Sequence, residues 1–252
     1  MLTRTPVSLA LVLLLVVVAA CQTVPTAPTG NPAPPYPCRF ASGPIAVDGR
    51  LDEPAWQNAA VIDTFYPYQP EDADSLSPTK ARLLWDNDHL YLAVECGDKD
   101  VWSFSDQPDD DMWNGDVAEF FVKPSVDKPI YYEFVIAANA TLYDARYPSR
   151  GAGGANRFKG WASNANIASV IAGTEGDWRD DDQGYTVEAA IPLAAFDEAG
   201  RPAAGDTWTF GIFRYDYSKE YEDPLLMMSI PEAPSHGFHS YEGYGLLVFE
   251  GP

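Results

Sequence analysis

The chain has 252 residues and a formal net charge of −21 at pH 7, from 37 acidic and 16 basic residues. A surface this acidic repels nucleic acid and anionic lipid, so the expected partners are neutral molecules or cations. The chain also contains no Gly-x-Ser-x-Gly elbow, no His-Glu-x-x-His motif and no P-loop. The sequence therefore gives no support for the enzyme classes that carry these motifs.

The first 20 residues are typical of an export signal. Arg4 precedes a mostly apolar run over residues 6–18, which is too short to span a membrane. The run ends in Val18-Ala19-Ala20-Cys21, which resembles the lipobox of bacterial lipoproteins, so Cys21 is the expected lipidated residue. Several acyl chains anchor a protein durably without a spanning helix. Gln22 after the cysteine implies sorting to the outer membrane.

Residues 21–37 are expected to form a spacer between this anchor and the folded domain. Prolines stand at positions 25, 28, 32, 34, 35 and 37. Such a segment favours extended polyproline geometry and cannot bury a core. No second linker follows, so residues 38–252 are expected to fold as one domain.

Two cysteines remain beside Cys21. Cys38 and Cys96 could form a disulfide in an oxidising cell envelope. Cys96 also shares strand parity with Leu90, Leu92 and Val94, which fits an ordinary buried thiol. The sequence leaves both alternatives open.

The first part of the domain predicts a short strand over residues 44–47, a turn at Asp48-Gly49 and a one-turn helix that starts near Pro54. Residues 80–85 and 89–96 predict two strands of a hairpin. The connection Asp86-Asn87-Asp88 has two acids that could begin a calcium loop, but it lacks the rest of a twelve-residue ligand pattern, and this favours a turn.

The central segment runs from Trp113 to Val122. Its second half alternates as a strand in which Val117, Glu119 and Phe121 share one face. A carboxylate on such an apolar face is costly unless it is paired or hydrogen-bonded. Residues 130–139 form a second alternating strand, which places Glu133 among aromatic residues. These features fit either a binding surface beside Trp113 or a core tryptophan with a structural ion pair.

The remaining chain predicts a long Gly-rich loop over residues 144–166, strands over 185–191, 208–217 and 244–249, and a helical turn over 192–196. About ten short strands without a long helical period predict an all-β fold, an antiparallel β-sandwich. Arg214 continues an apolar strand face and needs an anion, so we expect it to pair with Glu119.

Five motifs together resemble carbohydrate-binding module family 9. They are Ile45 to Trp56, Leu84 to Ala93, Trp113 to Phe121, Tyr185 to Pro192 and Tyr244 to Phe249. The resemblance covers residues 38–252 and implies a DOMON-like β-sandwich that binds carbohydrate without catalysis. No cofactor is expected, and calcium as a structural ion stays open because the family includes calcium-bearing members.

The resemblance also implies a ligand-binding site. Trp113 falls on the first of two tryptophans that clamp a sugar in this family, and Phe238 falls where the second would be. Glu119 matches a sugar-binding carboxylate, and Glu133 lies near a polar position that binds sugar hydroxyls. Val135 stands where sugar-binding members carry an arginine. The alternative for Phe238 is a ring that fills a core gap.

Other functions remain open at the level of sequence. Some DOMON relatives bind haem through Met and His, and the available residues here are Met227, Met228, His236 and His239, without a Cys-x-x-Cys-His motif. The two histidines are three residues apart and could both bind one metal ion, but the loop contains no further Cys or His ligand. Glu119 and Glu133 could form the carboxylate pair of a glycoside hydrolase.

Calcium is a further possibility in this acidic chain. The runs Asp109-Asp110-Asp111 and Asp180-Asp181-Asp182 concentrate oxygen ligands, but solvated acidic turns are the simpler explanation of both.

Overall fold

The fold is all-β. A computed structural model describes residues 33–154, 157–220, 223–231 and 237–251. Its strands are β1 (Tyr36–Phe40), β2 (Tyr66–Pro67), β3 (Thr79–Trp85), β4 (His89–Cys96), β5 (Val117–Lys123), β6 (Tyr131–Ala137), β7 (Leu142–Tyr147), β8 (Asn166–Ala172), β9 (Gly184–Pro192), β10 (Thr207–Asp216), β11 (Leu225–Met228) and β12 (Gly245–Phe249). The helices are single turns: α1 (Pro54–Asn58), η1 (Pro70–Asp72), η2 (Met112–Asn114), η4 (Leu193–Ala195) and η5 (Tyr241–Gly243).

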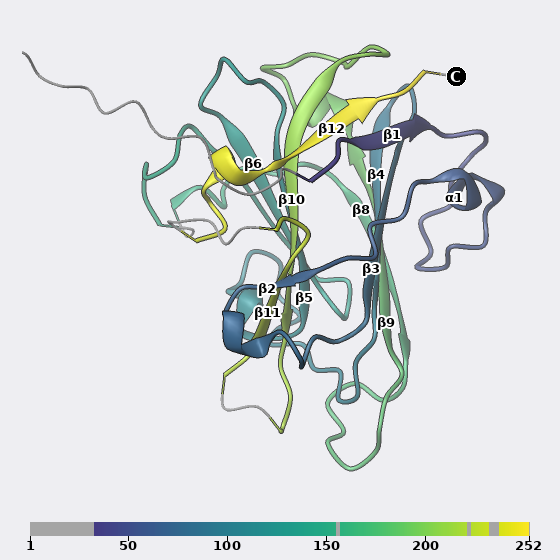
Figure 1. Ribbon diagram of the computed structural model, residues 1–252, viewed down its shortest axis with the longest axis vertical. Helices are drawn as coiled ribbons and strands as arrows, with labels where there is room; N and C mark the ends of the chain where they lie inside the picture. The colour runs from purple at the N-terminus through teal and green to yellow at the C-terminus, as the bar shows by residue number, and fades with distance from the viewer. Residues whose placement is uncertain (1–32, 155–156, 221–222, 232–236, 252) are drawn as a thin grey trace, which may run out of the picture.

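The strands form one continuous, barrel-like sheet. Its order is β7-β6-β5-β10-β12-β1-β3-β4-β9-β8, and β11 adds to β10 while β2 adds to β11. Figure 1 shows the two layers that result, with β5, β6 and β10 in one and β3, β4, β8 and β9 in the other. The prediction of an all-β fold is therefore confirmed in its class.

The sheet is mixed, which corrects the expectation of a purely antiparallel sandwich. β1 pairs parallel with β12 through Tyr36–Cys38, and parallel with β3 through Arg39 and Phe40. One five-residue strand thus links the two layers. It begins at Tyr36, inside the segment expected to be a spacer. Parallel pairing of strands from opposite ends of a chain leaves no local pattern, so the sequence could not indicate it.

The hairpin predicted before the central segment is confirmed. β3 and β4 pair antiparallel from Thr79↔Cys96 to Trp85↔Leu90. In the connection, one oxygen of Asp86 accepts hydrogen bonds from the backbone N–H groups of Asp88 and His89, each at 2.7 Å. This geometry is an ordinary turn that uses the carboxylate within the loop itself.

Other local expectations need correction. Residues 44–47 form no strand. Residues 144–166 were expected to form a loop, but β7 extends into this segment and β8 starts at its last residue, Asn166. β2 and β11 were also not expected. β2 has two residues and β11 has four, which is too short for a periodic hydrophobic pattern to identify a strand.

The main core fills the space between the two layers. Phe120, Phe134 and Ile212 face it from one layer, and Leu83 and Leu92 face it from the other, all of them buried. Alternation along each strand then directs Glu119 and Glu133 to the outer side of the β5–β6 layer.

A smaller apolar cluster lies outside the other layer, under α1. Trp56 is buried there, and its indole N–H donates to the Glu188 carboxylate at 2.9 Å. The other oxygen of Glu188 accepts from the backbone N–H groups of Asp48 and Gly49 at 3.0 Å. Gly49 has φ +81° and lies against the β8 backbone, where a Cβ would approach Ser169 to 2.7 Å. The predicted Asp-Gly turn is thus fixed by one buried carboxylate.

Cys38 and Cys96 are both free and buried, which agrees with the buried-thiol alternative and not with a disulfide. Burial raises the pKa of both thiols, to about 11 for Cys96. Among the described residues, no helix has the length and apolar character needed to cross a membrane. The export signal, Cys21 and most of the spacer lie outside the described residues.

Candidate functional site

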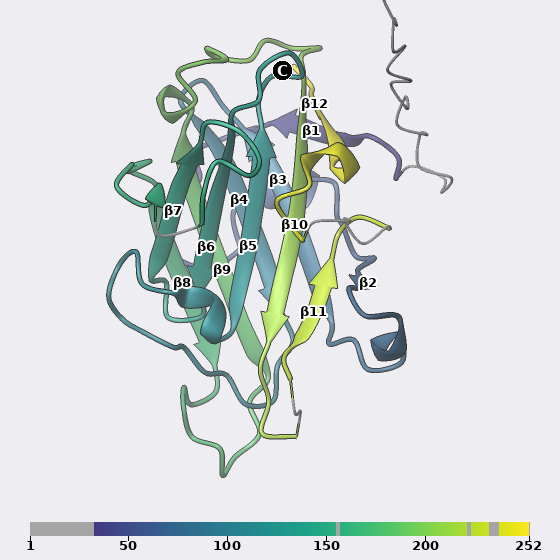
Figure 2. The same cartoon turned by 90° about the vertical axis from the view of Figure 1, so that its left-hand side faces the viewer.

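The candidate site is the outer side of β5, β6, β7 and β10, here called the carboxylate face, which Figure 2 presents to the viewer. Strand register sets two rows of side chains across it. Phe213, Glu119, Val135 and Tyr143 form one row, and Glu133 lies in the next row beside Phe121. Paired residues share a face of the sheet, so Glu119 and Glu133 meet diagonally across β5 and β6.

The two carboxyl groups form a hydrogen-bonded dyad. Glu119 is 4% exposed and Glu133 is 2% exposed, and their side chains bond to each other. Burial, followed by the negative charge of Glu133, raises the pKa of Glu119 well above its usual range. Glu119 is therefore the protonated member at neutral pH, and it donates its proton to the hydrogen bond with Glu133.

Tyrosines continue this network along β7. The Tyr147 hydroxyl donates to Oε2 of Glu133 and lies 3.1 Å from the Tyr143 hydroxyl. Tyr131 stacks on Tyr147 with ring centroids 4.9 Å apart, and its hydroxyl bonds Nδ1 of His239 at 2.9 Å. By contrast, Oε2 of Glu119 is buried and accepts no hydrogen bond from an N–H or O–H group of the described residues. A buried acceptor without a partner is costly, so this oxygen marks a position suited to a ligand hydroxyl.

Trp113 packs at the edge of the carboxylate face. η2 carries it at the start of β5, and its half-buried ring packs edge-on against Tyr143 with centroids 5.4 Å apart. The accessible part of this indole gives the carboxylate face an aromatic border. Tyr68 and Tyr215 are also half-buried on this face.

Phe238 does not have the role expected of it. Its ring is 6% exposed and stacks on Phe213 at 4.1 Å between centroids, while Tyr68 and Tyr215 pack edge-on against it. Protein rings already occupy the surface that a sugar would need. Phe238 therefore supports the face from within, as the alternative interpretation of the sequence held, and Tyr68 and Tyr215 are the accessible rings at this position.

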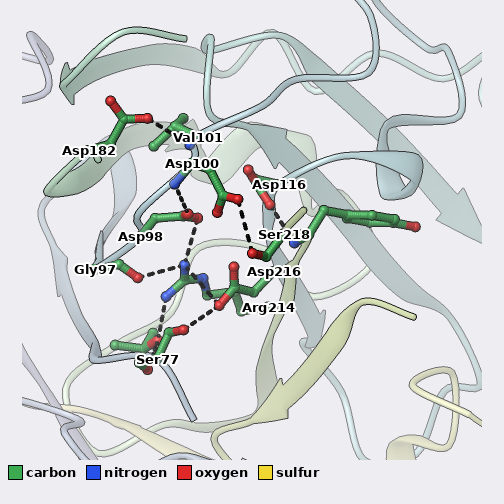
Figure 3. A network of polar contacts seen from close by, with 12 residues as sticks. Ser77, Gly97, Asp98, Asp100, Val101, Asp116, Asp182, Arg214, Asp216 and Ser218 are labelled. Atoms are coloured by element: carbon green, nitrogen blue, oxygen red, sulfur yellow. Dashed lines mark hydrogen bonds and ion pairs between the residues drawn. The ribbon is translucent and has the colours of Figure 1, made fainter. Parts of the chain in front are cut away.

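Arg214 does not pair with Glu119, which corrects the expected ion pair. Arg214 lies opposite Ala118 in the β5–β10 ladder, so it points into the core, whereas Glu119 lies opposite Phe213 on the outer side. Its guanidinium bonds Asp98 at 3.0 Å and lies 3.6 Å from Asp216, as Figure 3 shows.

Asp98, Asp116 and Asp216 form a buried aspartate cluster around this guanidinium. Their carboxylate oxygens lie within 4.8 Å of one another, a spacing that suits a metal ion. Arg214 already supplies a positive charge, and both oxygens of Asp116 accept backbone hydrogen bonds, from Trp102 at 2.6 Å and from Tyr217 at 2.7 Å. The donor set is thus largely satisfied by the protein, and it does not fit a cation well.

Protonation further reduces the charge of the aspartate cluster. Burial, followed by the charge of Asp98, raises the pKa of Asp116 to about 9. Burial, followed by the charge of Asp216, raises the pKa of Asp98 to about 6. At neutral pH one proton and one guanidinium therefore offset the charge of two of the three carboxyl groups.

Neither acidic run forms a metal site together with other described residues. Asp182 is buried and uses its two oxygens to accept from the backbone N–H groups of Val101 at 2.8 Å and Thr174 at 2.6 Å. Asp180 and Asp181 are exposed, and Asp109 to Asp111 are partly exposed. The Asp182 carboxylate thus joins the loop before Trp102 to the loop between β8 and β9. Its sequence context did not indicate this role.

The residues considered for haem binding are dispersed. Met227 and Met228 are buried on opposite sides of β11, where Met227 contacts Thr79 and Met228 packs on the carboxylate face. His239 is hydrogen-bonded to Tyr131, and His236 lies outside the described residues.

The dyad also lacks the geometry of a glycoside hydrolase. Retaining enzymes hold their two carboxyl groups about 5 Å apart, and inverting enzymes hold them farther apart. Glu119 and Glu133 are hydrogen-bonded to each other, whereas a hydrolase places the scissile bond between its two carboxyl groups.

Sequence reasoning missed Tyr143 and Tyr147, which complete the site. The alternation of Tyr143, Ala145 and Tyr147 is a strand signal that would have placed both tyrosines on one face. The surrounding glycines and charged residues obscured it.

Comparisons with known proteins concern the family and the fold. A family model described as carbohydrate family 9 binding domain-like matches residues 47–251. No curated protein matches the chain. A proposed carbohydrate-binding protein from Bacteroides uniformis has a solved structure with a TM-score of 0.67 and 15% identity, covering 87% of this chain and 100% of that one.

Two further solved structures are similar. Both are a family 9 carbohydrate-binding module from Caldicellulosiruptor kristjanssonii, one in complex with cellotriose and one with glucose. Their TM-scores are 0.61 and 0.58, each at 17% identity, and they cover 87% and 86% of this chain and 95% and 97% of their own. At these identities the likeness establishes the fold.

Proposed function

Because this chain belongs to the carbohydrate family 9 binding domain-like family, we propose that it binds neutral carbohydrate at the carboxylate face without catalysing a reaction. The observation that carries this proposal is the unpartnered Oε2 of Glu119, which is buried among tyrosines beside a half-exposed tryptophan. A sugar hydroxyl supplies the missing hydrogen bond, and a pyranose offers an apolar face of C–H groups for an aromatic ring.

The dyad suits a sugar hydroxyl because it offers an acceptor. The proton of Glu119 is engaged in the hydrogen bond to Glu133, and Oε2 of Glu119 accepts. A sugar hydroxyl can therefore donate to this oxygen. Since both carboxyl groups are almost fully covered, the half-buried rings of Trp113, Tyr68 and Tyr215 must shift to admit the ligand.

Binding is tested with purified protein on a glycan array, followed by calorimetric titration of glucose and cellotriose. We expect Trp113→Ala and Glu119→Ala to weaken binding by about tenfold or more, since each removes one main contact worth about 1 kcal/mol or more. Glu119→Gln retains a neutral donor and acceptor, and should bind nearly as the wild type does.

Leu246→Ala is the matched control, because Leu246 is 42% exposed on β12 and is not part of the carboxylate face. Binding that is absent for every glycan, or that is unaffected by both alanine substitutions, would refute the proposed site.

We also propose that the protein is lipid-anchored at Cys21 and located at the outer membrane, which would place its binding domain at the cell envelope, where glycan capture can support polysaccharide catabolism. The support is the lipobox-like sequence and Gln22. Labelled palmitate should enter the wild-type protein and not the Cys21→Ser variant. Equal labelling of both would contradict the anchor.

A further inference from the structure

A second group of aromatic side chains lies at the end of the domain where β4, β8 and β10 finish, the lower end in Figure 2. We call it the loop patch, and it comprises Trp102, Phe104, Trp178 and Tyr217. Trp102 is central, with ring centroids 6.3 Å from Trp178, 6.4 Å from Phe104 and 5.9 Å from Tyr217. Three separate loops therefore bring their aromatic residues together.

The loop patch is unusually accessible. Phe104 is 43% exposed and Trp178 is 39% exposed, and these are the only exposed aromatic rings among the described residues. Aromatic surface left in water is unfavourable by about 25 cal/mol per Å². A cluster of such rings, as opposed to a single one, indicates a binding surface.

Buried carboxylates hold the three loops in place. Asp116 accepts from the backbone N–H groups of both Trp102 and Tyr217, and its own N–H donates to the Trp102 carbonyl at 2.9 Å. Asp182 joins the loop before Trp102 to the loop that carries Trp178. The Lys219 ammonium donates to the Trp178 carbonyl at 2.9 Å. Rings fixed in this way lose little conformational entropy when a ligand binds.

The loop patch is also continuous with the carboxylate face. The Tyr217 hydroxyl donates to the backbone carbonyl of Trp113 at 3.0 Å. Gly115, directly after η2, lies so close to the backbone of Phe104 that a Cβ there would be 2.5 Å from the Phe104 nitrogen. The loop that bears Phe104 therefore packs directly against the turn that presents Trp113.

We propose that the loop patch is a second carbohydrate platform, which binds further sugar units of a neutral glycan chain whose other units occupy the carboxylate face. The inference rests on the proposed function. Aromatic rings stack on the apolar faces of pyranoses, and the net charge of −21 disfavours anionic glycans and anionic membranes. Affinity should consequently rise with the length of the sugar chain.

The test is calorimetric titration of glucose, cellotriose and cellohexaose into wild-type protein and the Trp178→Ala, Trp113→Ala and Leu246→Ala variants. Because Trp178 is exposed, we expect its substitution to leave the fold intact, and circular dichroism checks this. We expect Trp178→Ala to bind glucose as the wild type does and to bind cellohexaose about three- to tenfold more weakly. Trp113→Ala should weaken binding of all three sugars, and Leu246→Ala of none.

The outcomes separate the two proposals. Wild-type protein that binds glucose and cellohexaose equally, or Trp178→Ala that retains full affinity for cellohexaose, overturns the loop patch and leaves the proposed function standing. Wild-type protein that binds none of the sugars overturns both. Loss of binding to phosphatidylethanolamine vesicles in Trp178→Ala, with cellohexaose affinity unchanged, would assign the loop patch to a membrane surface and also overturn the inference.

Discussion

Replacing Arg214 with alanine is the most demanding test of the buried network. The Arg214 side chain is fully buried and donates to Thr79 at 3.0 Å, to the Gly97 carbonyl at 2.9 Å and to Asp98 at 3.0 Å. Asp216 lies at 3.6 Å from the same guanidinium. Alanine would remove the positive charge and leave two buried carboxylates without compensation. Breaking a buried ion pair on one side costs about 3–5 kcal/mol.

The assay is equilibrium urea unfolding of the wild type, Arg214→Ala and Arg150→Ala. Arg150 pairs with Glu242 at the surface, with exposures of 38% and 54%, so its loss should cost less than about 1 kcal/mol. Arg214→Ala should lower the free energy of unfolding by about 3–5 kcal/mol.

The loss in Arg214→Ala should also depend on pH. Without the guanidinium the pKa of Asp98 rises further above about 6. Protonation of Asp98 at about pH 5 then removes part of the repulsion between the buried carboxylates. The decrease in the free energy of unfolding should therefore be smaller at about pH 5 than at about pH 8. A loss similar to that of Arg150→Ala, or one that does not change with pH, would refute the proposed role of the guanidinium.

Three further predictions concern stability and accessibility. The raised pKa of Asp116 keeps a proton in the folded state that the unfolded chain releases above about pH 4, so the stability of the wild type relative to Asp116→Asn should fall as pH rises from about 4 to about 9. Urea unfolding at several pH values measures this difference in stability. A difference that stays constant with pH would contradict the prediction. A calcium chelator should leave the melting temperature of the protein unchanged, since Arg214 and backbone N–H groups already bind oxygens of the aspartate cluster. A clear decrease in calorimetry would show a bound ion. Cys38 and Cys96 should react with a thiol reagent only after denaturation, and labelling of the native protein or a failure to label in denaturant would contradict two buried free thiols.

Local alternation was sufficient to predict much of this fold. Residues 89–96 carry Leu90, Leu92 and Val94 at alternate positions, and β4 has these same bounds. The carboxylates of the site were recognisable for a related reason: Glu119 and Glu133 are polar residues in otherwise apolar strands, and such residues require a partner. Their mutual hydrogen bond shows that the required partner was the other carboxyl group.

Register is what the sequence could not provide. Glu119 and Arg214 both need an opposite charge or a hydrogen-bond partner, and pairing them is reasonable until the ladder is known. In the ladder Arg214 opposes Ala118, one residue from Glu119, and in a strand one residue changes the face. The same limit applies to Phe238, because its burial depends on Phe213 and Tyr68, which are distant from it in the sequence.

The position of β1 between β12 and β3 determines where the domain can be cut. A fragment that begins at residue 38, the boundary indicated by proline content, would lack Tyr36, whose hydroxyl donates to the Ala60 carbonyl and accepts from the Leu83 N–H. It would also lose part of the parallel pairing with β12 and leave that strand open on one side. Open strand edges promote self-association, so the shortened domain would tend to aggregate.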